Sequence, residues 1–332
     1  MNSTLKAILK QALPPSAIAL AKRIRDLGNQ AGAPKTSPSP SLEFTSSPAP
    51  SPPPPSPSQT PPSEPMAPLA KPAVELPEWE AVPDSDAVWT AHEGWAHHSI
   101  ANLQRERWPS FVTSLEGKRP FGWHDTKPGE PVDVSMHNTI VTFGHVLGCA
   151  SGGRTRISIL DWGGGAGQYL LYARKLRPDL QLDYVVKDLA SLCQVGRGVN
   201  PEATFVSDDA QALGRRYDLV FASSSVQYSR DLYGLLARIC DATAGWLMVT
   251  RSPFVEHHDD FVVVQRPYKY GYMSEYACWF INRHRFISFI EAKGLTLQRE
   301  FMLGERPYVP NAPEPCVYGG FLFKRTACRH YS

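Results

Sequence analysis

A glycine-rich turn, Asp161-Trp-Gly163-Gly-Gly165-Ala-Gly167, joins two segments with different patterns. The apolar run over 156–162 predicts a buried strand, and the spacing over 166–176 predicts a helix. Glycine allows a tight backbone turn and lets a ligand approach with no Cβ in the way. We therefore expect a cofactor-binding loop at this strand-to-helix junction.

The same alternation continues along the chain. Short apolar runs predict strands over 182–188, 203–207, 217–223 and 245–251, and helices are expected over 189–196 and 231–242. Strands that alternate with helices form a parallel, doubly wound sheet. After a last helix over 284–293, two strands follow within 295–325 without a helix between them, so one must be antiparallel. The predicted fold is α/β, a Rossmann-like seven-stranded sheet with an antiparallel last strand.

Composition divides the chain into four parts. Sixteen of its 31 prolines lie between Pro34 and Pro77, mixed with Ser and Ala, which is typical of a disordered spacer. We expect a basic amphipathic helical segment over 1–30, this Pro/Ser-rich linker over 31–77, a helical, Trp-rich cap and acceptor region over 78–150, and the cofactor-binding domain over 151–326.

The net charge of the chain and the spacing of its cysteines limit the kinds of partner and metal site that the sequence favours. A net charge of +2 gives no reason to expect nucleic acid as a partner. The six cysteines lie far apart in the sequence, which indicates a protein of a reducing compartment without a cysteine metal site. No secretory signal is recognisable, so a cytoplasmic protein is expected. Residues 1–30 carry five cations against one anion. Such helices lie on anionic membranes or dock on proteins, or they pack on their own domain. Peripheral contact with the inner membrane face through residues 1–28 is thus one open alternative.

The glycine turn resembles the first motif of the class I S-adenosylmethionine (SAM)-dependent methyltransferases, D-x-G-x-G-x-G. A dinucleotide fingerprint would need a third glycine where Gln168 stands. SAM carries an ammonium, a sulfonium and a ribose diol, which suit carboxylates. We expect Asp161 to organise the amino-acid end and Asp188 to accept hydrogen bonds from the ribose. The remaining expected cofactor-binding residues are Gly163, Gly164, Gly165 and Gly167 in the turn, with Asp208 and Asp209 near the adenine amino group.

A narrower resemblance extends over most of residues 79–303. The segments LDWGGGAGQY, ASSSVQY, TRSPF, VVVQRP and EYACWFINRHRF are similar to a bacterial methyltransferase family found among polysaccharide and O-antigen biosynthesis genes. The family also has a basic helix with Pro-Pro, like Pro14-Pro15, and a Gly-aromatic pair, like Gly94-Trp95. The chain departs from the family in two respects: the long Pro/Ser linker is unusual, and Glu275 and Ala277 stand in the acceptor region where a Ser and a Pro are expected. The resemblance implies a methyltransferase of surface polysaccharide biosynthesis.

Methyl transfer to a sugar hydroxyl needs positioning and a general base. In this fold acceptors approach over the ends of the fourth and fifth strands. The candidate catalytic residues there are Tyr228, His257, His258 and Asp260, with the two histidines ranked first. The HHDD run also leaves a divalent-cation site open as a minor alternative. Aromatic faces suit sugar stacking, and amides suit hydroxyls. The candidate acceptor-binding residues are Tyr272, Tyr276, Trp279 and Asn282.

The sequence therefore predicts SAM-dependent O-methylation of a hydroxyl on a saccharide or glycolipid. One alternative keeps the chemistry but uses a small metabolite or a lipid as acceptor. A second is a non-catalytic scaffold that retains the fold. A third, nicotinamide-dependent redox chemistry, is disfavoured by the missing third glycine and by the acid at the end of the first strand.

Overall fold

The strand order of the sheet is that of the class I methyltransferase fold. The computed structural model describes residues 76–122 and 133–326. Five parallel strands lie in the order β4-β3-β2-β5-β6 and carry the glycine turn. Strand β10 is antiparallel to both β6 and β9. Their bounds are β2 (Arg156–Trp162), β3 (Gln181–Lys187), β4 (Thr204–Val206), β5 (Tyr217–Ser223), β6 (Thr243–Val255), β9 (Leu295–Met302) and β10 (Val317–Arg325). The predicted fold class, including the antiparallel last strand, is confirmed.

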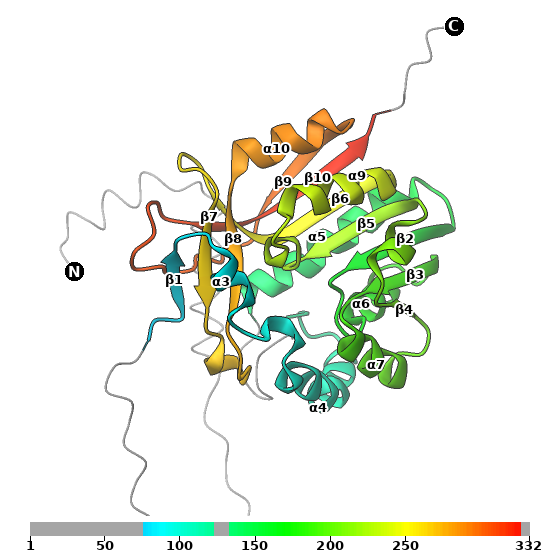
Figure 1. The fold of residues 1–332 in the computed structure, drawn as a ribbon. Helices are drawn as coiled ribbons and strands as arrows, with labels where there is room; N and C mark the ends of the chain where they lie inside the picture. The colour runs from blue at the N-terminus through cyan, green and yellow to red at the C-terminus, as the bar shows by residue number, and fades with distance from the viewer. Residues whose placement is uncertain (1–75, 123–132, 327–332) are drawn as a thin grey trace, which may run out of the picture. The chain divides into compact units, whose positions relative to one another are not determined.

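Three further strands extend this sheet beyond the seven predicted. They are β1 (Trp79–Val82), β7 (Phe261–Gln265) and β8 (Tyr276–Asn282). β8 pairs in parallel with the last residues of β6, β7 is antiparallel to β8, and β1 is antiparallel to β7 (Figure 1). The sheet of the described residues therefore has ten strands. The region expected to be helical from residue 78 begins instead with an edge strand.

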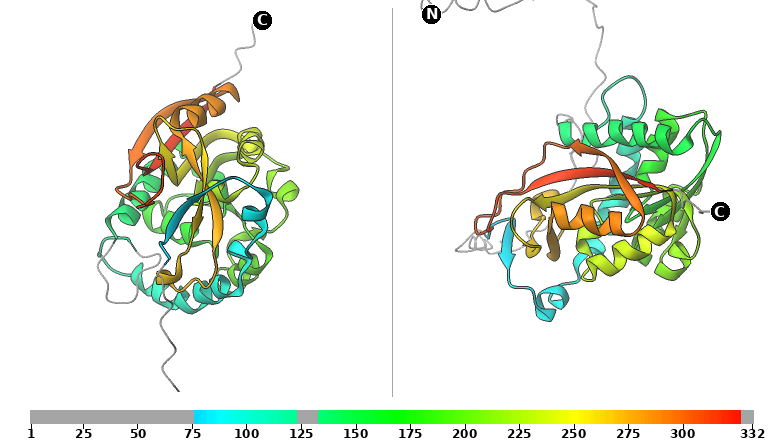
Figure 2. Two further views of the ribbon diagram at one scale, coloured as in Figure 1. Left: turned by 60° about the vertical axis from the view of Figure 1, so that its left-hand side comes forward. Right: turned by 90° about the horizontal axis from the view of Figure 1, so that it is seen from above.

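Helices cover both faces of the parallel strands (Figures 1 and 2). In β5, Leu219 and Phe221 belong to one buried cluster, while Val220 belongs to the other. Side chains alternate across a strand, so a sheet buried on both sides carries apolar residues at every position. The helices are α4 (His98–Ser114), α5 (Val134–Ser151), α6 (Gln168–Leu176), α7 (Ala190–Val199), α8 (Asp209–Leu213), α9 (Leu232–Ala242) and α10 (Arg283–Ala292), with short α3 (Asp86–Thr90) and η1 (Gly94–Ala96).

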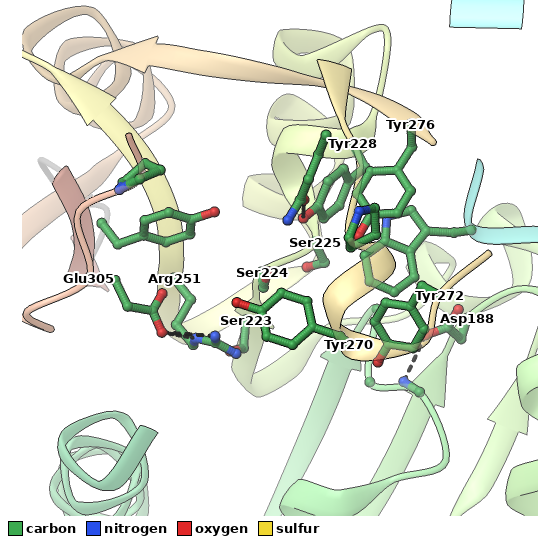
Figure 3. A pocket seen from close by; sticks show the side chains of 18 of the residues that line it. Asp188, Ser223, Ser224, Ser225, Tyr228, Arg251, Tyr270, Tyr272, Tyr276 and Glu305 are labelled. Carbon is green, nitrogen blue, oxygen red and sulfur yellow. Dashed lines mark hydrogen bonds and ion pairs between the residues drawn. The ribbon is translucent and has the colours of Figure 1, made fainter. Parts of the chain in front are cut away.

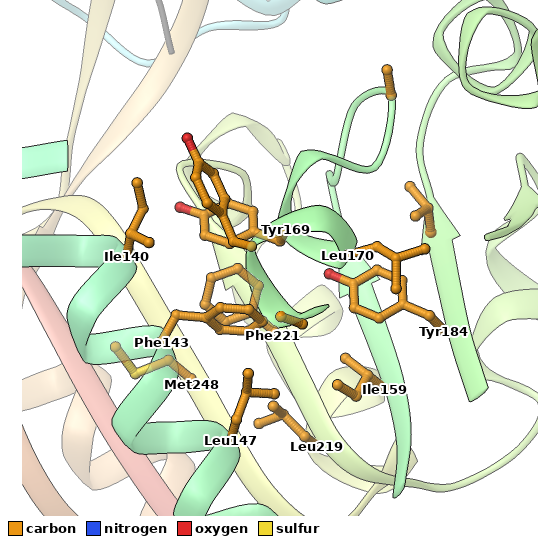
Figure 4. Close-up of a cluster of buried hydrophobic side chains, with 14 of the residues drawn as sticks. Ile140, Phe143, Leu147, Ile159, Tyr169, Leu170, Tyr184, Leu219, Phe221 and Met248 are labelled. Carbon is orange, nitrogen blue, oxygen red and sulfur yellow. The ribbon is translucent and has the colours of Figure 1, made fainter. Parts of the chain in front are cut away.

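Helix α5 packs in the same buried cluster as Leu219 and Phe221 of β5. Phe143 lies on its sheet-facing side, with ring centroids 4.6 Å from Phe221 and 5.1 Å from Tyr169 (Figure 4). Asp133 caps its first turn by accepting a hydrogen bond from the Met136 amide at 2.8 Å. This packing fixes α6, which follows the glycine turn.

Strand β6 is longer than predicted. It continues past residue 251 to Val255, where Pro253 pairs with Tyr318 and Phe254 with both Val317 and Ile281. The extension carries the segment 256–260 away from the end of the parallel strands. The other predicted elements lie within a few residues of those observed. The expected basic segment over 1–30 and the linker up to residue 75 lie outside the described residues. No described helix is long and apolar enough to cross a bilayer.

Two glycines of one helix give a matched test of the α7–β4 contact. A Cβ on Gly196 would lie 2.1 Å from the Phe205 ring, whereas one on Gly198 would have no neighbour within 4 Å. We expect Gly196→Ala to lower the free energy of unfolding by about 1–3 kcal/mol through overpacking. Gly198→Ala should raise it by about 0.5–1 kcal/mol because alanine favours helix. Urea denaturation measures both, and equal effects would contradict the packing described here.

Candidate active site

A pocket of about 1110 Å³ lies at the carboxyl ends of the parallel strands. The turn after β2, the residues after β3 and β5, and a residue within β6 all contribute to its lining. Trp95 and Gln104 reach it from the segment before the parallel strands. Ligands of open α/β sheets bind at this edge. Figure 3 shows the side chains that meet there.

The glycine turn needs its glycines for two reasons. Gly163, Gly165 and Gly167 have φ of 71°, 57° and 84°, a region that other residues rarely adopt. A Cβ on Gly164 would lie 2.5 Å from the Asp161 carboxyl group. Gly163, Gly164 and Gly165 line the pocket, whereas Gly167 precedes α6 and does not.

Asp161 lies beneath the turn and does not line the pocket. Its side chain accepts a hydrogen bond from the Tyr184 hydroxyl at 2.8 Å, and the residue is 1% exposed. Burial raises the pKa of Asp161 to about 7; the Tyr184 hydrogen bond opposes this, and the charge of Asp188 adds to it. Positive charge placed over the turn would favour the ionised carboxylate.

Asp188 ties the end of β3 to the glycine turn. One carboxylate oxygen accepts a hydrogen bond from the Gly165 amide at 2.7 Å, and the other accepts from Leu189 at 2.7 Å. Burial raises the pKa of Asp188, and these two hydrogen bonds lower it. Asp188 lines the pocket, and each oxygen keeps a further lone pair. The side chain can therefore still accept hydrogen bonds from a diol.

The two acids after β4 differ in position. Asp208 caps α8 through the Gln211 amide at 2.7 Å and does not line the pocket. Asp209 lines it and forms ion pairs with Lys187 at 2.6 Å and Arg238 at 3.3 Å. The structure thus brings one of the two predicted acids to the pocket.

Of the predicted catalytic residues, Tyr228 lines the pocket, and His257, His258 and Asp260 do not. Tyr228 packs edge-on against Tyr276, with ring centroids 5.1 Å apart, and burial raises its pKa. Asp260 accepts hydrogen bonds from the Tyr233 hydroxyl and the Asn282 amide. His257, His258 and Asp260 lie outside the pocket because β6 continues to Val255, which places the HHDD run in the loop after the strand, away from the pocket. No group of three or more His, Cys, Asp or Glu in the described ranges is placed to hold a metal ion.

The predicted acceptor residues divide in the same way. Tyr272 and Tyr276 line the pocket, and Trp279 and Asn282 do not. Tyr276 and Trp279 are three apart on β8, so they point to opposite faces. Trp279 donates to the Ser229 carbonyl at 3.1 Å, and Asn282 caps α10.

Other pocket residues were not predicted. Trp95 stacks on Tyr276 with centroids 4.8 Å apart, and its Nε1 is buried without a hydrogen-bond partner in the described part of the chain. Arg251 and Glu305 form an ion pair at 2.9 Å inside the pocket. The serines of ASSSVQY, residues 223–225, line it as well. Glu305 lies in the connection between β9 and β10, where no sequence motif marked it.

Comparison with known proteins finds similarity among solved structures alone. No family profile matches the chain, and no curated protein has a detectably similar sequence. Solved structures are similar at low identity. Magnesium protoporphyrin IX methyltransferase from Synechocystis, with bound SAM, is 12% identical, with a TM-score of 0.41, 68% of this chain covered and 97% of the other. A 1,6-didemethyltoxoflavin N1-methyltransferase from Burkholderia thailandensis is 16% identical, with a TM-score of 0.40, 69% of this chain covered and 90% of the other.

The buried acid beneath the turn gives a pH-dependent prediction. The pKa of Asp161 is raised from 3.8 to about 7. The folded state therefore holds more protons than the unfolded state between these values, and the stability due to this group falls as the pH rises through them. Asn cannot ionise but can accept the Tyr184 hydrogen bond. From pH 5 to pH 8, we expect the free energy of unfolding of Asp161→Asn to gain about 2–3 kcal/mol relative to wild type. Urea denaturation at both pH values measures the gain, and a pH-independent difference would refute this assignment.

Proposed function

We propose that this protein is a SAM-dependent methyltransferase. The observation that carries the proposal is the Gly165 amide bonded to the Asp188 carboxylate, at the carboxyl ends of strands in the class I order. When bound, SAM supplies a methyl group on a positively charged sulfur. The residues present fit it: Gly163–Gly165 line the pocket with backbone atoms that its amino-acid part can approach, and Asp188 suits the ribose diol. Asp161 and Asp188 favour a cation and would repel a pyrophosphate.

We further propose that the acceptor is a saccharide or glycolipid hydroxyl. Trp95, Tyr228, Tyr272 and Tyr276 form an aromatic wall on one side of the pocket, and such surfaces bind sugar rings by stacking. The Arg251–Glu305 pair offers polar groups for hydroxyls on another side. The family resemblance to polysaccharide-cluster methyltransferases supports the same acceptor class.

The remaining proposals concern partners and location. We propose a cytoplasmic protein whose residues 1–28 contact the inner membrane face peripherally, on the basis of their charge and amphipathic spacing. That position would suit a lipid-linked saccharide. Two alternatives remain: the acceptor is a small metabolite or a lipid, or the protein is a non-catalytic scaffold. An assay of methyl transfer to compounds of each class distinguishes them, since a scaffold would methylate none.

Calorimetric titration of the full-length protein with S-adenosylhomocysteine tests the cofactor. We expect micromolar binding and no binding of NADH. Asp188→Ala should weaken binding by about 1–3 kcal/mol, or about 5- to 150-fold, because a ribose hydrogen bond is lost.

Asp183→Ala is the matched control for that variant. Asp183 lies within β3, the strand that Asp188 directly follows, pairs with Arg215 at 2.9 Å and does not line the pocket. It should leave the affinity unchanged. Thermal melts of both variants confirm folding. Absence of S-adenosylhomocysteine binding by the folded wild type would refute the methyltransferase proposal.

A further inference from the structure

We propose that Glu305 is the general base of this site and that Arg251 positions it. The inference rests on the proposed function and commits the acceptor to a hydroxyl group. Arg251 donates from Nε and Nη2 to the same carboxylate oxygen, Oε1, at 3.2 and 2.9 Å. Within the described part of the chain, Oε2 of Glu305 has no hydrogen-bond partner. The ion pair therefore holds the carboxylate while leaving one oxygen able to take a proton.

The backbone around Glu305 is also fixed. Its carbonyl accepts a hydrogen bond from the Tyr318 amide at 3.0 Å, which attaches this part of the connection to β10. Gly304 has φ of 95° and turns the chain just before Glu305. A base held at both backbone and side chain is preorganised for proton transfer.

The two described non-glycine residues with positive φ lie here: Arg251 itself, within β6, and Ser224, directly after β5. Ser224 has φ of 51° and Arg251 has φ of 53°. The buried Gln227 side chain donates to the Arg251 carbonyl at 3.3 Å and the Ser224 hydroxyl at 3.4 Å. Its own carbonyl oxygen accepts from Ser252 at 3.0 Å. Left-handed backbone at non-glycine residues costs energy and gathers at functional sites. Here it directs Arg251 into the pocket.

The position of the pair suits an acceptor beside the cofactor. Tyr169, two residues after the glycine turn, hydrogen-bonds Ser223 at 3.0 Å, which joins the turn to the end of β5. In the view of Figure 3, Ser223 and Ser224 lie between Asp188 and the Arg251–Glu305 pair. An acceptor hydroxyl over these serines would thus have the ribose-binding acid on one side and the Glu305 carboxylate on the other.

The other carboxylates of the pocket are engaged elsewhere. Asp188 holds the glycine turn, Asp209 pairs with two cations, and Asp133 caps α5. Glu78 pairs with Lys269 at 2.6 Å. No histidine of residues 76–122 and 133–326 lines the pocket. Glu305 is the acid that remains for the acceptor.

The proton and electron balance is simple. The acceptor O–H bond breaks as its oxygen forms the new bond to the methyl carbon. The proton passes to Oε2 of Glu305, and the electron pair of the broken carbon–sulfur bond stays on the neutral thioether product. Glu305 then returns the proton to solvent.

The test compares Glu305→Gln with Glu300→Gln in the full-length protein. Glu300 is an exposed glutamate on β9 that pairs with Arg283, outside the pocket. Methyl transfer from SAM is measured on a panel of methyl glycosides and nucleotide sugars, with S-adenosylhomocysteine affinity measured in parallel. Glu305→Gln should keep that affinity within about threefold but lose about 10²- to 10⁴-fold in rate. Glu300→Gln should match wild type in both.

Further readouts separate a base from a structural residue. The wild-type rate should fall in acid, and Glu305→Gln should lack this limb of the pH profile. Formate should partly restore the rate of Glu305→Ala, and chloride should not. Arg251→Lys should change the pH at which the rate falls in acid, and this variant should still bind S-adenosylhomocysteine. A further readout needs no turnover. The ¹³C carboxyl resonance of Glu305 is assigned by its loss in Glu305→Gln. It should shift when a methylated glycoside from the panel is added to the complex of the protein with S-adenosylhomocysteine.

The possible failures are distinguishable. A wild-type rate in Glu305→Gln overturns the base and leaves the methyltransferase proposal standing. Wild type that binds S-adenosylhomocysteine yet methylates no hydroxyl compound overturns both the hydroxyl acceptor and the base. Wild type that does not bind S-adenosylhomocysteine overturns the proposed function itself.

Discussion

The hydrogen bond from the Gly165 amide to the Asp188 carboxylate holds together the side of the pocket that we propose binds the cofactor. It connects the turn after β2 to Asp188, which follows β3. The strands β2 and β3 are themselves paired in parallel along their length. Other residues would be strained at Gly163, Gly165 and Gly167, where φ is positive, and a Cβ on Gly164 would collide with the Asp161 carboxyl group. A backbone loop held in this way presents a fixed surface to a ligand before it binds, which lowers the ordering cost of binding.

The side of the pocket with the aromatic wall, where we propose that the acceptor binds, is built by a different part of the chain. The extra strands β1, β7 and β8 attach to the extension of β6 and bring Tyr276 to the pocket, where Trp95 stacks on it. Helix α4 supplies Gln104, whose side-chain oxygen accepts from the Ala166 amide at 3.0 Å in the turn. The Trp-rich segment therefore contacts both the glycine turn and the aromatic wall, so that binding on the two sides is physically connected.

Sequence patterns predicted the parallel strands well because each is a short apolar run next to its own helix. The last hairpin was predicted because its two strand-like runs follow one another with no helix between them. The end of β6 was missed because Pro253 normally interrupts a strand, yet here it sits beside β10 at the pairing with Tyr318. Strands β7 and β8 pair with each other across a short connection, but β7 also pairs with the distant β1 and β8 with the end of β6, and no local pattern encodes these last two pairings. The cofactor loop was predictable from one contiguous motif. The aromatic side of the pocket was predictable only in part. Tyr228, Tyr272 and Tyr276 were named from the sequence and line the pocket, whereas Trp95, Arg251 and Glu305, which come from three distant segments, were not named.

The charges beneath and beside the turn decide which ligand the loop prefers. A phosphate-binding turn presents backbone amides toward an anion at a helix N-terminus. In this protein the Gly165 amide is already bonded to Asp188, and Asp161 lies buried below with its pKa raised to about 7. An anion over this turn would raise the cost of ionising both acids, whereas a cation would lower it. The same backbone shape that serves phosphates in dinucleotide-binding folds therefore favours a positively charged ligand here, and the two carboxylates make that difference.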